Sequence, residues 1–130
     1  MDTKVVIQIP VKDLAKAAEF YKAIGFSVTD HGAVMGNPLP IALTLNSEFT
    51  VLLIEAEEFQ YRIPNKICDA TQNTQMIFVM ELNSLNKCEQ TVQKVVAAGG
   101  KSLGGNLHDG VKFQDLDGHM WNLQVVPRGK

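Results

Sequence analysis

The sequence predicts an α+β protein built from two copies of one βαβββ module, a strand and a helix followed by three strands. Three observations support this prediction. The order of apolar patterns repeats, the expected helix caps Asp13 and Ser84 lie 71 residues apart, and a length of 130 residues suits two small units. We therefore expect modules at residues 1–57 and 75–130, joined by a linker at residues 58–74.

The first module begins with an apolar strand at residues 4–10, which is rich in Val and Ile. Asp13 can then cap a helix whose apolar positions recur at helical spacing as far as Ile24, and Gly25 stands where a left-handed residue would end it. Three further strands are expected, at residues 26–29, 41–45 and 50–55.

The second module repeats this order, with a strand at residues 76–82 and a helix that runs from the Ser84 cap to Gly99. Its remaining strands are expected at residues 101–103, 111–114 and 120–126. A helix covers only one face of each sheet, so we expect curved mixed sheets around a ligand-sized cleft, with the helices on the outer face.

Composition and charge exclude several classes of partner. Hydrophobic residues make up 45% of the chain and charged residues 20%, as in an ordinary globular protein. The net charge of -2, without a basic stripe, argues against nucleic acid. No apolar run approaches the roughly 20 residues of a membrane helix, and the first residues lead into a strand pattern, so we expect a cytoplasmic protein.

The chain has two cysteines, Cys68 and Cys88, which are too few for a disulfide framework. We expect both to be reduced, and Cys88 to be a small buried residue on the apolar stripe of its helix. In the linker, Phe59, Tyr61 and Ile63 alternate at spacing two, which indicates either anchoring to the core or a lid over a pocket. Residues 37–40 are a further irregular loop that could border such a pocket.

Two motifs resemble the vicinal-oxygen-chelate superfamily, which includes glyoxalase I, bleomycin-resistance proteins and extradiol dioxygenases. Residues 9–14 with residues 20–26 resemble the opening of such a module, and residues 113–121 resemble its closing hairpin. Residues 58–64, 69–71 and 97–101 are similar to a bacterial glyoxalase-like subgroup usually described as predicted lactoylglutathione lyases. The resemblance covers nearly the whole chain and implies a homodimer with a small-molecule ligand.

Enzymes of that superfamily hold a divalent metal with His, Glu or Gln side chains on the first and fourth strands of each module. Counted from the helix starts, these positions fall at Val6, Leu53, Ile77 and Asn122. One amide and three aliphatic side chains cannot supply the donors that a divalent cation needs, so we expect no bound metal. A shift of two residues would instead offer a polar set that could restore a metal site: Gln8, Glu55, Gln75 or Val79, and Gln124.

Residues two apart share one face of a strand, which extends the expected cavity lining beyond these four positions. A mixed lining of aliphatic side chains with amides and acids suits an uncharged or weakly cationic organic molecule, although the same side chains could fill a closed sheet interface. Arg62 in the linker could clamp a carboxylate or phosphate of the ligand. The predicted ligand-binding residues are Gln8, Leu53, Glu55, Ile77, Met120, Asn122, Gln124 and Arg62.

The histidines offer little chemistry. His119 should point opposite Asn122 and form structural hydrogen bonds, whereas His108 beside Asp109 is either a proton-transfer pair at the cavity mouth or a solvated loop residue. No nucleophile motif is present, so no catalytic residue is assigned. We therefore expect a metal-free binding protein. The alternatives are a metal-dependent lyase, isomerase or dioxygenase of the glyoxalase I type, and a dimeric scaffold with an empty cleft.

Overall fold

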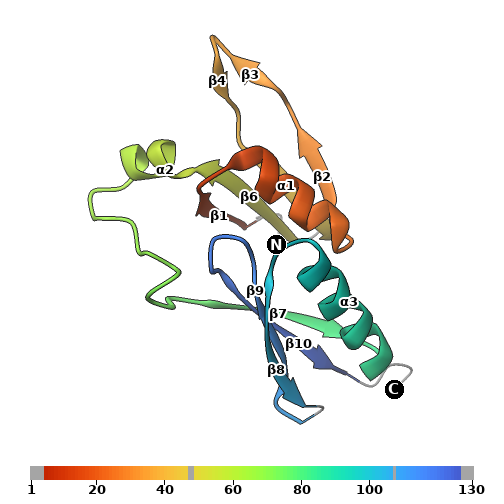
Figure 1. Ribbon diagram of the computed structural model, residues 1–130. Coiled ribbons are helices and arrows are strands. Elements are labelled where there is room, and N and C mark those ends of the chain that lie inside the picture. The colour runs from red at the N-terminus through yellow and green to blue at the C-terminus, as the bar shows by residue number, and fades with distance from the viewer. Residues whose placement is uncertain (1–4, 47–48, 107, 127–130) are drawn as a thin grey trace. The chain divides into compact units, whose positions relative to one another are not determined.

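The computed structural model describes residues 5–46, 49–106 and 108–126. The chain forms two compact units, which we call unit 1 and unit 2, and the division between Ile67 and Cys68 falls within the predicted linker. Each unit contains a four-stranded mixed sheet with one long helix packed on it (Figure 1). Within the described ranges, no helix is long and apolar enough to cross a membrane.

Unit 1 has the sheet order β1-β6-β5-β2. β1 and β6 run parallel, and the other neighbours run antiparallel. A short hairpin, β3–β4, is inserted between β2 and β5 and extends beyond the sheet (Figure 1). The elements are β1 (Val6–Val11), α1 (Leu14–Ala23), β2 (Ser27–Asp30), β3 (Ala33–Val34), β4 (Asn37–Pro38), β5 (Ile41–Asn46), β6 (Phe49–Glu55) and α2 (Ala56–Arg62).

Unit 2 has the equivalent order, β7-β10-β9-β8, with β7 parallel to β10 and the other neighbours antiparallel. The order and directions of strands therefore match in the two units, which confirms the predicted pair of βαβββ modules. The elements are β7 (Ile77–Leu82), α3 (Leu85–Ala97), β8 (Lys101–Asn106), β9 (Gly110–Gln114) and β10 (Met120–Val125).

The signals that predicted the long helices are visible in their ends. The Asp13 carboxylate accepts a hydrogen bond from the Lys16 amide at 3.0 Å, and the Ser84 hydroxyl accepts one from the Lys87 amide at 3.2 Å. Each bond satisfies one of the free N–H groups of a first helical turn. Gly25 has φ +114 and Gly99 has φ +99, a backbone conformation that glycine adopts without steric cost.

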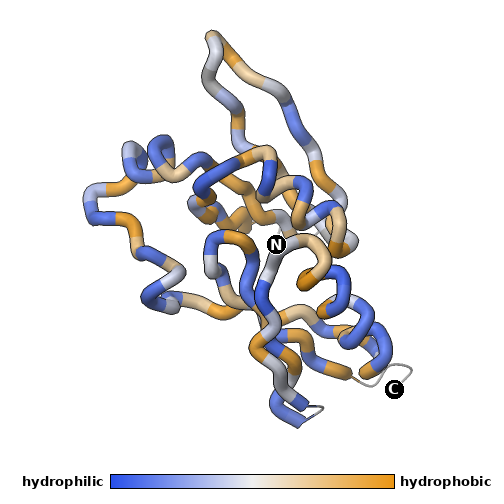
Figure 2. The backbone as a smooth tube through the Cα atoms, in the orientation of Figure 1, coloured by the Kyte–Doolittle hydropathy of each residue, from blue (hydrophilic) through white to orange (hydrophobic). Residues whose placement is uncertain are grey.

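Each helix covers one sheet face, which we call the helix-covered face, and closes a hydrophobic core against it. Hydrophobic residues dominate long stretches of β1 and β6, whereas α3 is largely hydrophilic away from its buried stripe (Figure 2). In unit 1, Tyr21 is fully buried and makes edge-to-face contacts with Phe20 and Phe26 at 5.1 and 5.3 Å between ring centroids. Cys88, on the buried side of α3, is fully buried, as predicted, and both cysteines are free thiols.

The predicted linker is not irregular throughout, because residues 56–62 form the helix α2. Its sequence Ala-Glu-Glu-Phe-Gln-Tyr-Arg is rich in helix formers, with Glu57 and Glu58 in the first turn and Arg62 in the last, where they favour the helix dipole. The spacing-two pattern was therefore misleading. Tyr61 is 89% exposed and does not anchor the segment.

The predicted loop at residues 37–40 is also partly regular, since Asn37 and Pro38 form β4. The hairpin turns at Met35 and Gly36, which have φ +52 and +83. Positive φ at both central residues is typical of the tight turns that match strand twist. The exposed Met35 side chain gave no sign of this turn in the sequence.

Candidate functional site

The face of the unit 2 sheet away from α3, which we call the open face, carries a mixture of apolar and polar side chains. The parallel register pairs Ile77 with Met120, Val79 with Asn122 and Glu81 with Gln124, and paired residues point to the same side of a sheet. β9 adds Lys112, opposite Asn122, and Gln114, opposite Met120. The predicted grouping of Ile77, Met120, Asn122 and Gln124 on one face is thus confirmed; their role in binding stays a prediction.

Aliphatic side chains on the open face are accessible. Ile77 is 49% and Val79 53% exposed. Asn122, in contrast, is 7% exposed, and its side-chain Oδ1 is buried without a hydrogen-bond partner among the described residues. The amide lies over Gly110, where a Cβ atom would collide with it. A buried amide oxygen without a partner costs free energy, so this position calls for an explanation other than packing.

The helix-covered face of the same sheet is an aromatic core. Trp121 is 2% exposed and stacks on Phe78 at 4.7 Å and on Phe113 at 6.1 Å between ring centroids. The strand therefore separates Trp121 from Asn122 as the alternation predicted, with one neighbour in the core and the other on the open face.

Unit 1 corrects part of the predicted site. β1 pairs Gln8 with Leu52 and Ile9 with Leu53, so Gln8 lies on the face opposite Leu53 and Glu55. Leu53 is fully buried in the helix-covered core, and Glu55 continues that face at the end of β6. Gln8 itself is exposed. The structure therefore does not bring Gln8 together with Leu53 or Glu55.

The open face of unit 1 is the side of Gln8 and Leu52, and it is poor in polar groups. It contains one buried polar atom, the Thr50 hydroxyl, which lacks a hydrogen-bond partner among the described residues, as the Asn122 oxygen does in unit 2. The fourth strand of each module thus carries one such atom on its open face. The members of this face on β1 and β6 are Val6, Gln8, Pro10, Thr50, Leu52 and Ile54.

The side chains do not fit a divalent metal. The register makes Leu52, and not Leu53, the counterpart of Asn122, since Thr50 pairs with Val6 as Met120 pairs with Ile77. The inferred metal positions are then still three aliphatic residues and one amide. The alternative set is broken as well, because Gln8 and Glu55 face opposite sides. Among the described residues, no three His, Cys, Asp or Glu side chains gather as a metal site would require.

Arg62 and His108, two further candidates, have local roles in the structure. The Arg62 guanidinium lies 3.3 Å from the Glu58 carboxylate, one helical turn away. His108 is exposed, and its amide donates to Oδ1 of Asn106, which also holds the Asp109 amide at 2.8 Å. The Asp109 carboxylate accepts a bond from Asn106, so the loop is organised by Asn106.

The closing-hairpin motif contributes to the fold. Asp115 is 5% exposed, and its Oδ1 accepts hydrogen bonds from the amides of Asp117 and His119 at 2.9 and 2.8 Å. Gly118 has φ +92, and a Cβ there would contact the Ala70 carbonyl at 2.7 Å. The Asp-Leu-Asp-Gly-His sequence therefore shapes a tight turn, and His119 takes part through its backbone.

The Cys88 thiol is a poor nucleophile, because burial raises its pKa and Glu89 adds to this effect.

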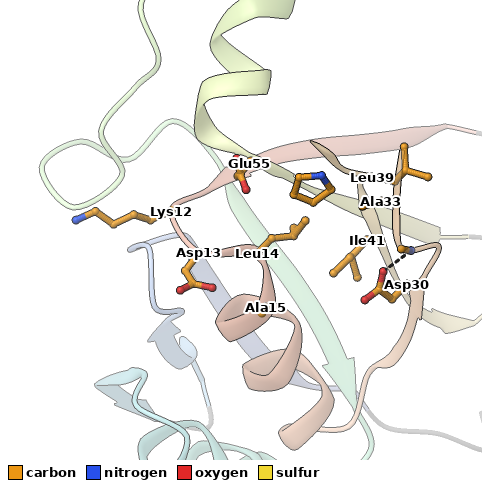
Figure 3. A pocket seen from close by; sticks show the side chains of 11 residues that line it. Lys12, Asp13, Leu14, Ala15, Asp30, Ala33, Leu39, Ile41 and Glu55 are labelled. Carbon is orange, nitrogen blue, oxygen red and sulfur yellow. Dashed lines mark hydrogen bonds between the residues drawn. The ribbon is translucent and has the colours of Figure 1, made fainter. Parts of the chain in front are cut away.

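A cavity in unit 1, which sequence reasoning did not identify, has a volume of about 530 Å³. It lies at the start of α1 and is bordered by the β3–β4 hairpin, with Pro38 and Leu39 in its wall. Figure 3 shows Glu55 next to Leu14 on one side of the apolar side chains and Asp30 on the other. The lining residues are Lys12, Asp13, Leu14, Ala15, Asp30, Gly32, Ala33, Pro38, Leu39, Ile41 and Glu55.

Comparisons with known proteins identify the family through one family model and the fold through solved structures. Residues 5–123 match the Glyoxalase/Bleomycin resistance protein/Dioxygenase superfamily. A hypothetical protein from S. aureus is 28% identical, with a TM-score of 0.83 over 97% of this chain and 95% of that chain. A glyoxalase-related enzyme from Fulvimarina pelagi is 22% identical, with a TM-score of 0.70 over 95% and 87%.

An antibiotic binding protein from Streptomyces sp. CB03234 also has this fold. It is 16% identical, with a TM-score of 0.65 over 97% of this chain and 98% of that chain. No curated protein matches significantly.

Proposed function

Because the chain belongs to the Glyoxalase/Bleomycin resistance protein/Dioxygenase superfamily, we propose that it is a binding protein for a small organic molecule, which it holds without a metal on the open face of unit 2. The observation that carries this proposal is the combination on that face of half-exposed Ile77 and Val79 with the buried, unpartnered amide oxygen of Asn122. Accessible apolar surface supplies affinity, and a few polar groups supply orientation.

The side chains favour a neutral ligand with apolar area and hydrogen-bonding groups. Gln114 and Gln124, both half-buried, add two amides that can donate or accept. The face also has charges of both signs, because Glu81 on the edge strand β7 is exposed, and Lys112, opposite Asn122, donates through its ammonium to the Asp109 carbonyl at 3.2 Å. Neither sign dominates, so no strong selection for an anion or a cation is expected there.

Binding without metal is supported by the donor set. Metal-dependent relatives need side chains that coordinate, and the aliphatic residues Val6, Leu52 and Ile77 cannot coordinate a cation. A similar fold occurs in an antibiotic binding protein, so sequestration of an organic compound is one use that this architecture allows. Fold alone does not choose the ligand.

The test uses Nile red, a neutral apolar dye, as the probe for the open face. We expect Val79→Lys to weaken dye binding about tenfold, because it places a charge in the apolar part of the face. The matched control is Val96→Lys on the outer side of α3, since Val96 is 54% and Val79 53% exposed. Equal effects of the two substitutions would show that the dye does not report on this face, and the proposal would fail.

A second measurement separates binding from catalysis. We expect less than about one metal ion in ten chains after dialysis, and no lactoylglutathione formation from the methylglyoxal hemithioacetal when zinc or nickel is added. One retained ion per chain, or turnover on the order of 1 per second or faster, would instead establish the enzyme alternative.

Asn122→Leu should change dye binding while leaving the unfolding midpoint nearly unchanged, because it removes a polar group that has no partner among the described residues.

A further inference from the structure

We propose that the cavity of unit 1 is a separate binding site for an organic cation, a protonated amine attached to an apolar body. The cavity does not involve the open face of unit 2, so this proposal is independent of the function proposed above. Its volume of about 530 Å³ falls within the range of roughly 300–1,000 Å³ that small-molecule sites occupy.

The cavity exists because the sheet extends beyond the N-terminal end of α1. α1 begins at Leu14, and the helix-covered face continues beyond it to Glu55 on β6 and Asp30 on β2. The β3–β4 hairpin borders this uncovered end without filling it (Figure 3). In unit 2, β9 begins four residues after β8 ends, and the depression beside the cap of α3 measures about 260 Å³.

Glu55 supplies the main charge of the site. The side chains before it on the same face, Val51 and Leu53, are fully buried and apolar, so the carboxylate stands at the end of a hydrophobic core. The Glu55 side chain is half-buried and lines the cavity, and its carboxylate makes no hydrogen bond or ion pair with any described residue. It also caps α2 by position only, without a side-chain bond. A partly desolvated carboxylate in such a place favours a cationic partner.

The other charged groups leave the cavity acidic. Asp30 accepts one bond from the Gly32 amide at 2.7 Å, and Asp13 accepts one from the Lys16 amide at 3.0 Å, so each carboxylate retains further acceptor capacity. Lys12 extends away from the apolar lining residues (Figure 3). An ammonium group has three N–H donors and no acceptor, which suits a cavity that offers carboxylates.

The rest of the wall is apolar and would hold the body of the ligand. Its side chains come from the first turn of α1, the hairpin and the start of β5, and they include Leu14, Ala33, Pro38, Leu39 and Ile41. Removing an alkyl or aromatic group from water against this wall would favour binding. A carboxylate ligand of the same shape would be repelled by Glu55.

The experiment compares three probes of one shape on the full chain: 4-phenylbutylammonium, 4-phenylbutanol and 4-phenylbutanoate. Titrations followed by backbone-amide NMR give affinity and location together. We expect the ammonium to bind about tenfold more tightly than the alcohol, and the carboxylate to bind most weakly. The shifted amides should cluster at Leu14, Leu39, Ile41 and Glu55. No preference for the ammonium, or shifts elsewhere, would overturn the proposal.

Substitutions test whether Glu55 is the residue that causes the preference for the ammonium probe. Glu55→Gln should weaken ammonium binding about tenfold and leave alcohol binding unchanged. Glu57→Gln is the matched control, because Glu57 is an exposed glutamate two residues away and outside the cavity. Leu39→Ser should weaken both ligands. If Glu57→Gln had the same effect as Glu55→Gln, the preference would reflect general surface charge and not this site.

Two further variants separate loss of binding in the cavity from loss of folding and from effects in unit 2. Should Glu55→Gln unfold, Asp30→Asn provides a second test, since the amide keeps an oxygen to accept from Gly32 while removing the charge. Val79→Lys in unit 2 should leave ammonium binding unchanged. The two proposals can therefore fail separately: dye binding reports on the open face, and amine selectivity reports on the cavity.

Discussion

Units 1 and 2 share a sheet order and a capped helix, yet they differ in what is inserted between the strands. In unit 1, residues 31–40 connect β2 to β5 and contain the β3–β4 hairpin, and α2 follows β6. In unit 2, only residues 107–109 separate β8 from β9. The insertion creates the 530 Å³ cavity beside α1, so one scaffold has acquired a concave site in one copy and a plain hairpin in the other.

Equivalent positions show a second difference, in where each unit keeps its polar groups. Register equates Leu52 with Asn122 and Glu55 with Val125. Unit 1 therefore has an apolar residue on its open face and an acid at the end of its helix-covered face, and unit 2 has the reverse. Duplicated modules can thus divide binding chemistry between opposite faces of the same sheet design.

The largest expected effect concerns the hydrophobic cores of the two units. It compares how much one buried side chain stabilises each core. Trp121 is equivalent to Val51 by register, and it stacks between Phe78 and Phe113. Trp121→Ala should lower the free energy of unfolding by about 3–5 kcal/mol, and Val51→Ala by about 1–3 kcal/mol. Urea denaturation of both variants measures this. A loss for Trp121→Ala no greater than that for Val51→Ala would mean that the aromatic stack is not the anchor of unit 2.

A second test concerns the helices, where Cys88 in α3 occupies the place of Ala17 in α1 relative to the caps. Burial and Glu89 raise the pKa of the Cys88 thiol above its ordinary value. We expect iodoacetamide at pH 8 to modify half-buried Cys68 on the order of 100-fold faster than Cys88, since the thiolate is the nucleophile and Cys88 reacts only after opening. Peptide mapping by mass spectrometry gives both rates, and equal rates would contradict the buried placement.

The same pKa shift has a consequence for stability. The unfolded thiol ionises at its ordinary value of 9.0, below the pKa of the folded state. The contribution of Cys88 to the free energy of unfolding is therefore complete below pH 9.0. It is lost as the pH rises through the pKa of the folded state. Cys88→Ala, which places the unit 1 residue in α3, should remove this part of the alkaline decline. An unchanged decline in the variant would assign it to other groups.

The sequence was sufficient for the modules, helix caps and unit 2 face, and the reason lies in particular residues. β10 alternates Met-Trp-Asn-Leu-Gln-Val, with Trp121, Leu123 and Val125 on one side and both amides on the other, so its faces could be assigned from period two. β6 reads Val-Leu-Leu-Ile-Glu, and Leu53 and Ile54 on opposite sides are both buried. An apolar run on both faces has no period, which is why Leu53 was placed on the wrong side.

Two other features could not be predicted because their causes are not local. The cavity depends on where α1 begins relative to the end of the sheet and on a hairpin whose exposed tip has no apolar pattern. The helix α2 is short, at seven residues, and a spacing-two pattern of Phe59, Tyr61 and Ile63 competed with its helix propensity. Strand register and tertiary placement, and not residue type, decide these features.

The connection between β8 and β9 in unit 2 gives a further test. Gly110 has φ +89, and a Cβ there would collide with the Asn122 amide. Gly110→Ala should cost about 2 kcal/mol or more. Gly104→Ala is the control, because Gly104 has φ +75 with open space around it and should cost only the backbone strain, about 1 kcal/mol. Equal costs in denaturation experiments would show that Asn122 does not rest on Gly110.

A double substitution sharpens this result. In an Asn122→Ala background, the collision is removed, so Gly110→Ala should then cost no more than Gly104→Ala. The coupling free energy between positions 110 and 122 should be about 1 kcal/mol. A coupling free energy near zero would contradict the contact between the Asn122 amide and Gly110.

The smallest expected effect concerns α2, the short helix that follows β6 in unit 1. Arg62 and Glu58 form an i,i+4 pair at 3.3 Å with 39% and 54% of their side chains exposed, a geometry in which water and salt screen the attraction. Arg62→Gln should lower the free energy of unfolding by about 0.2–0.5 kcal/mol, and 1 M NaCl should abolish the difference. Glu58→Gln is the paired control, and the double variant should lose no more than either single one. If Arg62→Gln alone weakened binding of an anionic dye while Glu58→Gln did not, Arg62 would have the ligand-clamping role that the sequence predicted, and α2 would belong to a binding site and not only to the surface of unit 1.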